Sequence, residues 1–131
     1  MRTIKVKFWN GKKMSNPYEL LDMLYEGCPP EIADIEGELN TDPKFLKKIV
    51  VLQFTGLLDK SGKEIYEGDI VKVETKEIFL VAWYDNGACF RYYQMENENP
   101  VDTNSPLNYD DVEVIGNIYE NKKLLIKNYD K

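Results

Sequence analysis

Carboxylates are the side chains of this sequence best suited to catalysis, and four of them, Asp59, Glu64, Glu67 and Asp69, lie within a short stretch. Paired carboxylates can act as general acids, general bases or nucleophiles. The chain contains no histidine, which excludes Ser–His–Asp and Cys–His catalytic systems and a histidine general base. Because no other motif organises these carboxylates, the sequence predicts a protein that is not an enzyme, with no catalytic residues.

Motifs for metals and cofactors are also missing. Cys28 and Cys89 are single and far apart, so they supply too few ligands for a four-thiolate zinc site or an iron–sulfur cluster. The segment from Asp59 to Glu64 lacks the spacing of a calcium-binding loop, and no GxxxxGK[ST] or GxGxxG phosphate loop occurs. We therefore expect no metal and no cofactor. A reduced, cytoplasmic protein with free thiols is the favoured interpretation, and a Cys28–Cys89 disulfide is the alternative.

The composition limits the class of protein further. With 131 residues, of which 43% are hydrophobic, the chain has room for one globular domain, or one domain with a small appendage. Its 17 basic and 23 acidic residues give a net charge of −6, so broad electrostatic attraction to nucleic acid or an anionic membrane is not expected. No stretch approaches the roughly 20 apolar residues of a membrane helix, and the chain does not start with a signal-peptide pattern.

The first charges of the chain depart from this acidic balance, because all five before residue 16 are positive. Residues 4–9 alternate apolar and polar side chains, which predicts a half-buried strand, and Asn10-Gly11 predicts a type I′ hairpin turn. One interpretation is an edge hairpin whose lysines prevent pairing with other strands. The alternative is a nucleic-acid-binding surface, with Trp9 or Tyr93 stacking on bases and phosphates contacted by Lys5, Lys7, Lys12 and Lys13.

Helical elements are expected between this hairpin and residue 49. Ser15-Asn16-Pro17 is typical of a helix start, leucines follow at helical spacing, and Gly27 favours a helix end. This pattern predicts a helix over residues 17–26. Residues 28–42 contain two prolines and five acidic residues and indicate an irregular acidic connector, after which residues 43–48 have room for one helical turn.

From residue 49 onward the sequence predicts short strands joined by tight turns, a pattern typical of a small β-barrel. The strands are expected at residues 49–54, 70–73, 77–84, 88–93 and 112–119, and the polar stretch 94–108 with its two prolines is expected to form a loop. The predicted organisation is one compact unit. In it, residues 1–48 hold the N-terminal hairpin, short helix and acidic connector, and residues 49–131 hold the barrel with a C-terminal tail.

The hairpin formed by residues 77–93 has a register that can be predicted. If Asn86-Gly87 are its two loop residues, Tyr84 pairs with Cys89 and each earlier residue with one further along. One face then carries large apolar side chains, which we assign to the core: Phe79, Val81, Trp83, Phe90 and Tyr92.

The other face of this hairpin places Arg91 between two tyrosines, Tyr84 and Tyr93. Tyrosine and arginine are enriched where protein interfaces derive their binding energy. We therefore predict Tyr84, Arg91 and Tyr93 as binding residues. The alternative is that the N-terminal helix or a loop covers this face.

Two blocks of the sequence resemble the YopX family of phage and prophage proteins. These are QFTGLLDKSGKEIYEGDIV at residues 53–71 and VEVIGNIYEN at residues 112–121, and the start of the chain, with Phe8-Trp9 and Gly11-Lys12-Lys13-Met14, is similar to the family's N-terminal block. The resemblance implies a phage or prophage origin and an SH3-like barrel in the C-terminal part. It implies no catalytic residues, because the family has no established activity.

The first block also has a structural explanation. Thr55-Gly56 and Ser61-Gly62 favour turns, and Asp59 can cap its own turn through its carboxylate. Gly68-Asp69 permits a sharp entry into the next strand. A block made of turn residues is more typical of a folding signature than of an active site.

Together these observations predict a mainly β (α+β) protein, a small SH3-like barrel preceded by an N-terminal β-hairpin and a short helix. The predicted function is a non-enzymatic interaction module in the bacterial cytoplasm. It would bind an unknown host or phage protein through Tyr84, Arg91 and Tyr93 or through the acidic stretch 94–113. Binding of nucleic acid by the basic hairpin is the less favoured alternative, and no membrane partner is expected. Self-association is compatible with both, because an apolar barrel edge can pair with its copy.

Overall fold

The computed structural model describes residues 3–33, 39–74, 77–96, 99–106 and 111–125. The chain divides into two compact units, residues 1–54 and 55–131. The predicted division of the chain at residues 48 and 49 lies just before this boundary, which falls inside a long strand. Across the described ranges, no helix has both the length and the apolar character needed to span a bilayer.

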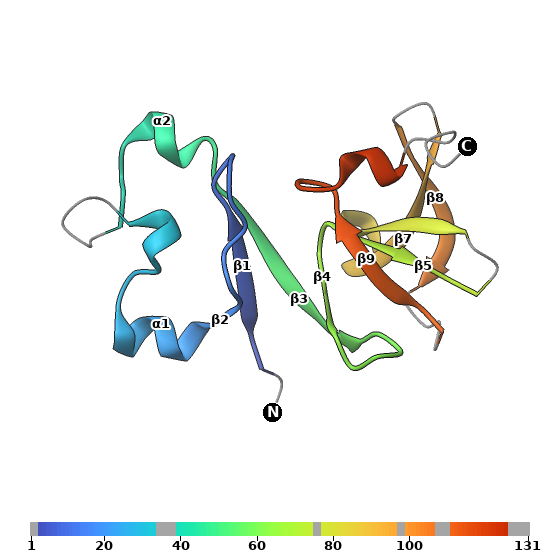
Figure 1. Ribbon diagram of the computed structural model, residues 1–131, viewed down its shortest axis with the longest axis horizontal. Coiled ribbons are helices and arrows are strands. Elements are labelled where there is room, and N and C mark those ends of the chain that lie inside the picture. Colours follow the sequence, from blue (N-terminus) through green and yellow to red (C-terminus); the bar gives the residue numbers. More distant parts are fainter. Residues whose placement is uncertain (1–2, 34–38, 75–76, 97–98, 107–110, 126–131) are drawn as a thin grey trace. The chain divides into compact units, whose positions relative to one another are not determined.

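The first unit is built around strand β1 (Lys5–Trp9), which pairs antiparallel with β2 (Tyr18–Glu19) and with the first half of β3 (Val50–Leu58). Helix α1 (Leu20–Glu26) follows β2 directly, beside the start of β1, and the short helix α2 (Pro43–Leu46) precedes β3 (Figure 1). A 3₁₀ turn, η1 (Pro30–Ile32), lies between the two helices. The buried apolar side chains of this unit include Phe8, Ile32 and Leu52.

The predicted helix of the first unit exists but starts later than expected, at Leu20 rather than residue 17. The reason is that Ser15 has another role. Its amide donates to the Phe8 carbonyl and its hydroxyl accepts from the Phe8 amide, both at 2.8 Å. Ser15 therefore extends the pairing of β1 and does not cap the helix. The predicted helix end at Gly27 is confirmed, because this glycine has a φ of 93° and its amide donates to the Met23 carbonyl.

The N-terminal hairpin is confirmed, but its turn is longer than the predicted two residues. The Asn10 side-chain oxygen accepts hydrogen bonds from the amides of Lys12 and Lys13, at 3.0 and 2.8 Å, and the next pairing is the bridge between Trp9 and Met14. The helical turn predicted at residues 43–48 is also confirmed as α2, whose first turn is capped by the carboxylate of Asp42.

The second unit contains a five-stranded antiparallel sheet in the order β8-β7-β6-β5-β9, and a hairpin between the end of β3 and β4 (Figure 1). The bounds are β4 Glu64–Tyr66, β5 Asp69–Lys72, β6 Ile78–Tyr84, β7 Cys89–Glu96, β8 Asn99–Pro106 and β9 Glu113–Asn117, with 3₁₀ turns η2 at Asp85–Gly87 and η3 at Lys122–Leu125. Its core consists of Ile65, Val71, Val73, Phe79, Val81, Tyr92 and Val112. The prediction of a mainly β protein is confirmed, and the closure of this sheet into an SH3-like barrel stays a prediction.

The prediction of a loop over residues 94–108 is wrong. Strand β7 continues to Glu96, and β8 follows at Asn99–Pro106 and pairs with β7 at the edge of the sheet. An edge strand needs ladder hydrogen bonds on one side only, so it tolerates prolines such as Pro100 and Pro106. The polar composition of this segment fits an edge strand as well as it fits a loop.

Candidate functional site

The register predicted for the β6–β7 hairpin is confirmed along its length: Val81 pairs with Tyr92, Ala82 with Arg91, Trp83 with Phe90 and Tyr84 with Cys89. Only the turn differs from the expectation. Asp85–Gly87 form a 3₁₀ turn, and Ala88 adopts a left-handed conformation with a φ of 49°. The loop therefore has four residues instead of two. The register of the strands is unchanged because one residue is added on each side of Asn86-Gly87.

Tyr84, Arg91 and Tyr93 lie on one face of this hairpin, as predicted, because alternate residues of paired strands share a face. The guanidinium carbon of Arg91 is 3.9 Å from the centroid of the Tyr84 ring, which is a close cation–π contact. All three side chains are half-buried. The structure thus brings Tyr84 and Arg91 into direct contact and places Tyr93 two residues further along the same strand.

Gly87 allows the Tyr84 ring to lie against the turn. A Cβ atom at this position would be 2.8 Å from Cδ1 of Tyr84 and 3.3 Å from Sγ of Cys89. Gly87 was predicted as one of two loop residues, but among the described residues with positive φ its neighbour Ala88 is found and Gly87 is not. The requirement for glycine here is close approach of a side chain.

The opposite face of the hairpin was assigned to the core, and this prediction is correct for Phe79, Val81 and Tyr92. It is wrong for Trp83, which is 43% exposed, and Phe90 is only half-buried. The Trp83 ring packs edge-on against Phe90, with centroids 5.0 Å apart and an interplanar angle of 73°. The aromatic row of the core therefore continues to the surface at the end of the hairpin.

Two pairs of side chains thus meet at the end of the β6–β7 hairpin, one pair on each face. We call this group the hairpin tip, and it consists of Trp83, Tyr84, Phe90 and Arg91. Trp83 was missed as a candidate binding residue because the alternation of apolar side chains predicts the face of the sheet on which a side chain lies. It does not predict how deeply that side chain is buried.

The residues of the alternative, nucleic-acid-binding site are also partly brought together. Lys5, Lys7 and Trp9 alternate along β1 and therefore share a face, where the Lys5 ammonium is 5.7 Å from the centroid of the Phe54 ring. Lys12 and Lys13 are exposed in the turn that follows. The residues of the predicted nucleic-acid-binding site thus lie partly on one face of β1 and partly in the adjacent turn.

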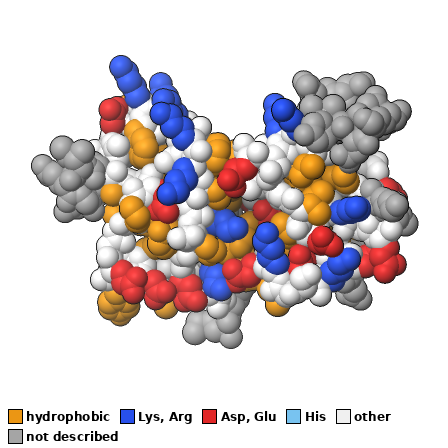
Figure 2. Space-filling model, viewed as in Figure 1, with side chains coloured by type: hydrophobic (Ala, Val, Ile, Leu, Met, Phe, Trp, Pro, Cys, Tyr) orange, Lys and Arg blue, Asp and Glu red, His pale blue; other side chains and the backbone are white. Residues whose placement is uncertain are grey.

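The structure adds lysines that the sequence analysis did not include. A methyl group on Gly11 would lie 3.7 Å from Cβ of Lys48, so the turn at residues 10–13 lies beside the end of α2. Lys44 lies in α2, and Lys47 and Lys48 lie in the turn that follows it. Figure 2 shows blue side chains gathered over α2 and the neighbouring turn. We call the five exposed lysines here the basic cluster: Lys12, Lys13, Lys44, Lys47 and Lys48.

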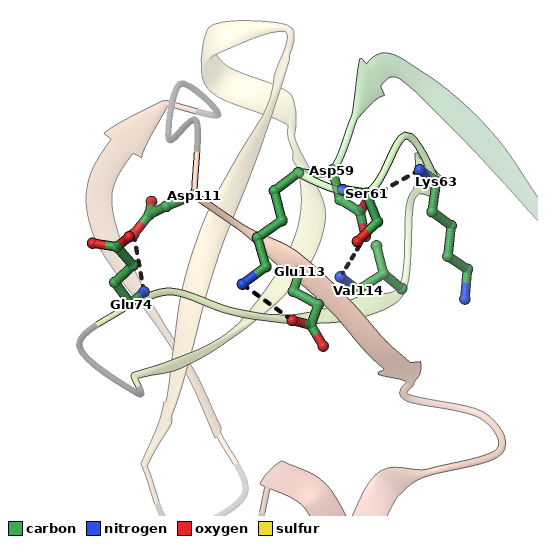
Figure 3. A network of polar contacts seen from close by, with 8 residues as sticks. Asp59, Ser61, Lys63, Glu74, Asp111, Glu113 and Val114 are labelled. Carbon is green, nitrogen blue, oxygen red and sulfur yellow. Dashed lines mark hydrogen bonds and ion pairs between the residues drawn. The ribbon is translucent and has the colours of Figure 1, made fainter.

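Three of the four carboxylates that could have formed an acid–base site accept hydrogen bonds within the fold: Asp59, Glu64 and Asp69. Asp59 is only 7% exposed, and its carboxylate accepts hydrogen bonds from the amides of Ser61 at 2.8 Å, Lys63 at 2.9 Å and Val114 at 3.0 Å (Figure 3). Burial by itself raises the pKa of this carboxyl, but the three amides and the Lys63 charge outweigh burial and lower the pKa below its usual value. The predicted cap of its own turn is confirmed, and the bond to Val114 is an addition.

A second carboxylate of the same block, Asp69, is also buried, and it accepts a hydrogen bond of 2.8 Å from the Tyr66 amide. Glu64 accepts one of 3.0 Å from the Tyr66 hydroxyl. Burial, together with the charges of Glu64 and Asp69, raises the pKa of Tyr66 far above its ordinary value. In the described parts of the chain, no group of three or more His, Cys, Asp or Glu side chains is placed to hold a metal ion.

The acidic stretch 94–113, which was the other candidate binding segment, lies largely outside the described side chains. Asp111 is described, and its carboxylate accepts a hydrogen bond of 2.9 Å from the Glu74 amide. Glu113 pairs with the Lys60 ammonium at 3.3 Å (Figure 3). These two acidic residues therefore hold neighbouring strands and loops together.

Comparison with known proteins places this arrangement in a family. A family model described as YopX protein matches residues 8–126. The chain belongs to the YopX family. The resemblance predicted from the sequence is thereby confirmed, and the match includes both the hairpin tip and the basic cluster of this YopX chain. Among curated proteins, none matches it.

A solved structure similar to this YopX chain is that of protein EF1440 from Enterococcus faecalis. The two sequences are 27% identical, the match covers 94% of this chain and 98% of that chain, and the TM-score is 0.57. The similarity therefore extends over both units. It supports the fold and adds no activity, since the name of that protein states none.

Proposed function

We propose that this YopX-family chain is a phage- or prophage-derived, non-enzymatic interaction module that acts in the bacterial cytoplasm and binds a host or phage protein through the hairpin tip. The observation that carries the proposal is the concentration of Trp83, Tyr84, Phe90 and Arg91 at the end of one hairpin. Tryptophan, tyrosine and arginine dominate the residues whose truncation weakens protein interfaces most.

The geometry of the hairpin tip favours binding because its side chains are already ordered. The Tyr84 ring holds the Arg91 guanidinium at 3.9 Å, and Phe90 holds Trp83 edge-on. Fixing such side chains before association lowers the conformational entropy that binding would otherwise cost. We expect the partner to offer a carboxylate for the guanidinium and an apolar pocket for the Trp83 ring.

The absence of an enzymatic role is part of the proposal. Three of the four carboxylates that could act as acids or bases are engaged in the fold, since Asp59 accepts three backbone amides, Asp69 accepts one and Glu64 accepts the Tyr66 hydroxyl. A carboxylate held in this way is poorly placed to exchange a proton with a substrate.

The experiment is capture of proteins from nuclease-treated bacterial lysate by the immobilised chain, quantified by mass spectrometry. The variants Trp83→Ala, Tyr84→Ala, Arg91→Ala and Tyr93→Ala are compared with a matched control, Tyr25→Ala, which removes an aromatic side chain that is 88% exposed on α1. We expect one protein to be retained by the wild type and the control and to be lost from the other four variants, because Tyr93 shares a face of the hairpin with Tyr84 and Arg91. Equal retention by all five variants would disprove the assignment.

Self-association through the same surface is a second form of this proposal. It is distinguished by measuring the molar mass of the purified chain by light scattering over a range of concentrations. If the hairpin tip joins two copies, Arg91→Ala shifts the mass towards the monomer and Tyr25→Ala does not.

A further inference from the structure

We propose that the basic cluster is a second binding surface, in the first unit, and that it takes the phosphodiester backbone of a single-stranded nucleic acid, with Trp9 as a stacking platform for a base. The surface is distinct from the hairpin tip. It is formed by the turn at residues 10–13 and by α2 with the turn that follows it, which are separated by about thirty positions in the sequence and meet where Gly11 lies beside Lys48.

The backbone of this surface is fixed while its charges stay accessible. The Asn10 side-chain oxygen accepts from the amides of Lys12 and Lys13, and the Asn10 side-chain amide donates to the Glu31 carbonyl at 3.4 Å. In α2, Asp42 caps the first turn by accepting from the Lys44 amide at 2.9 Å. The five ammonium groups therefore extend from two anchored segments.

The charges of the cluster are not neutralised within the described part of the chain. All five lysines are exposed, and no ion pair joins any of them to a described acidic side chain. Grouping like charges in this way is unfavourable. In a protein of net charge −6, such a group creates a local positive potential that a polyanion would relieve.

One feature favours a nucleic-acid strand over an acidic protein, because lysine ammonium groups act as point charges and by themselves suit phosphates and carboxylates alike. Trp9 stands at the base of the turn, where it pairs with Val50 and bridges Met14, and it is only half-buried. Clustered lysines beside a partly accessible aromatic ring are the combination that binds single strands with little sequence preference.

The test is fluorescence anisotropy of a labelled oligothymidine with the full chain, at a series of salt concentrations. For single strands, the logarithm of the binding constant falls with the logarithm of salt concentration by about 0.7 per phosphate neutralised. We expect Lys12→Gln/Lys13→Gln and Lys47→Gln/Lys48→Gln each to reduce this slope by about 1 to 1.5. The matched control is Lys122→Gln/Lys123→Gln, an adjacent exposed pair in η3 with the same change in charge, and it should leave the slope unchanged.

The role of Trp9 is tested separately. Trp9→Phe keeps an aromatic ring and should bind nearly as well as the wild type, whereas Trp9→Ala should weaken binding roughly 5- to 100-fold, the range for loss of one stacked base. Circular dichroism of each variant shows whether the chain remains folded, and a folded Trp9→Ala variant that binds as tightly as the wild type would overturn the stacking role.

Other outcomes would overturn the proposal. One is the absence of binding at low salt, and another is a loss of affinity in the Lys122/Lys123 control equal to that in the cluster variants. A third is equal affinity for a duplex of the same length together with no effect of the Trp9 substitutions. A fourth is competition by polyglutamate as strong as competition by unlabelled oligothymidine. The last result would assign the surface to an acidic protein. Arg91→Ala should bind the oligonucleotide like the wild type, so failure of this proposal and failure of the hairpin-tip proposal are distinguishable.

Discussion

The carboxylate of Asp59 accepts a hydrogen bond from the Val114 amide, 3.0 Å away, and so joins two segments of the second unit that are 55 positions apart. The neighbouring residue strengthens this connection, because the Lys60 amide donates to the Val112 carbonyl at 2.9 Å. The β3–β4 hairpin loop is thereby fastened to the start of β9. Asp59 lies in the first YopX block and Val114 in the second, so this contact joins the two blocks within the second unit.

The first prediction concerns the stability that this contact provides. Asp59→Ala leaves the amides of Ser61, Lys63 and Val114 without their acceptor, and a buried donor left unsatisfied costs about 1–3 kcal/mol. We expect the free energy of unfolding in urea to fall by at least this much. The matched control is Lys60→Ala, which removes a half-exposed ion pair with Glu113 and should cost less than about 1 kcal/mol. Equal losses in the two variants would show that Asp59 is not the fastening residue.

The second prediction concerns pH. Because the pKa of Asp59 is lowered in the folded state, its ionisation stabilises the fold fully above the unfolded pKa of about 3.9, and this stabilisation disappears as the pH falls through the folded value. Asp59→Asn cannot ionise, so its melting temperature should lie below that of the wild type at pH 6 to 7, and the gap should narrow below about pH 4. Thermal unfolding followed by circular dichroism measures both. A gap that stays constant down to pH 3 would contradict the assignment.

The third prediction separates the core from the hairpin tip. Phe79 is 5% exposed and packs against Tyr92 with centroids 5.6 Å apart, so Phe79→Ala should destabilise the chain by about 3–5 kcal/mol. Trp83 is 43% exposed and fills no enclosed space, so Trp83→Ala should cost less than half as much although it removes a larger side chain. Urea unfolding of the two variants provides the comparison. A larger loss for Trp83→Ala would mean that this ring belongs to the core and is not available to a partner.

The β6–β7 hairpin shows what the sequence could predict and where it stopped. Strict alternation fixes which side chains share a face, so the pairing of Ala82 with Arg91 and the shared face of Tyr84 and Arg91 were predictable. Alternation carries no information on where the neighbouring strands end. For this reason Trp83 was assigned to the core with Phe79, although the core ends before it.

Other differences arise from contacts distant in sequence. Ser15 is a residue type that often caps helices, but here its hydroxyl and its amide are hydrogen-bonded to the backbone of Phe8 on the neighbouring strand. The spacing of Lys44, Lys47 and Lys48 was visible in the sequence, and only the fold brings Lys48 beside Gly11. Local patterns therefore predicted the elements well, whereas the candidate surfaces depend on how those elements meet.

The fourth prediction concerns Gly87, because the absence of a side chain here leaves room for the Tyr84 ring to pack against Arg91. A Cβ atom here would be 2.8 Å from the Tyr84 ring, so Gly87→Ala should push the ring away and destabilise the hairpin by about 1–3 kcal/mol. In a Tyr84→Ala background the clash is gone, and the same substitution should then cost much less. The ring-current shift of the Arg91 side-chain protons, measured by NMR, reports directly on the contact. If Gly87→Ala kept that ring-current shift and lowered the free energy of unfolding equally in both backgrounds, the glycine would be required by the turn and not by the Tyr84–Arg91 contact.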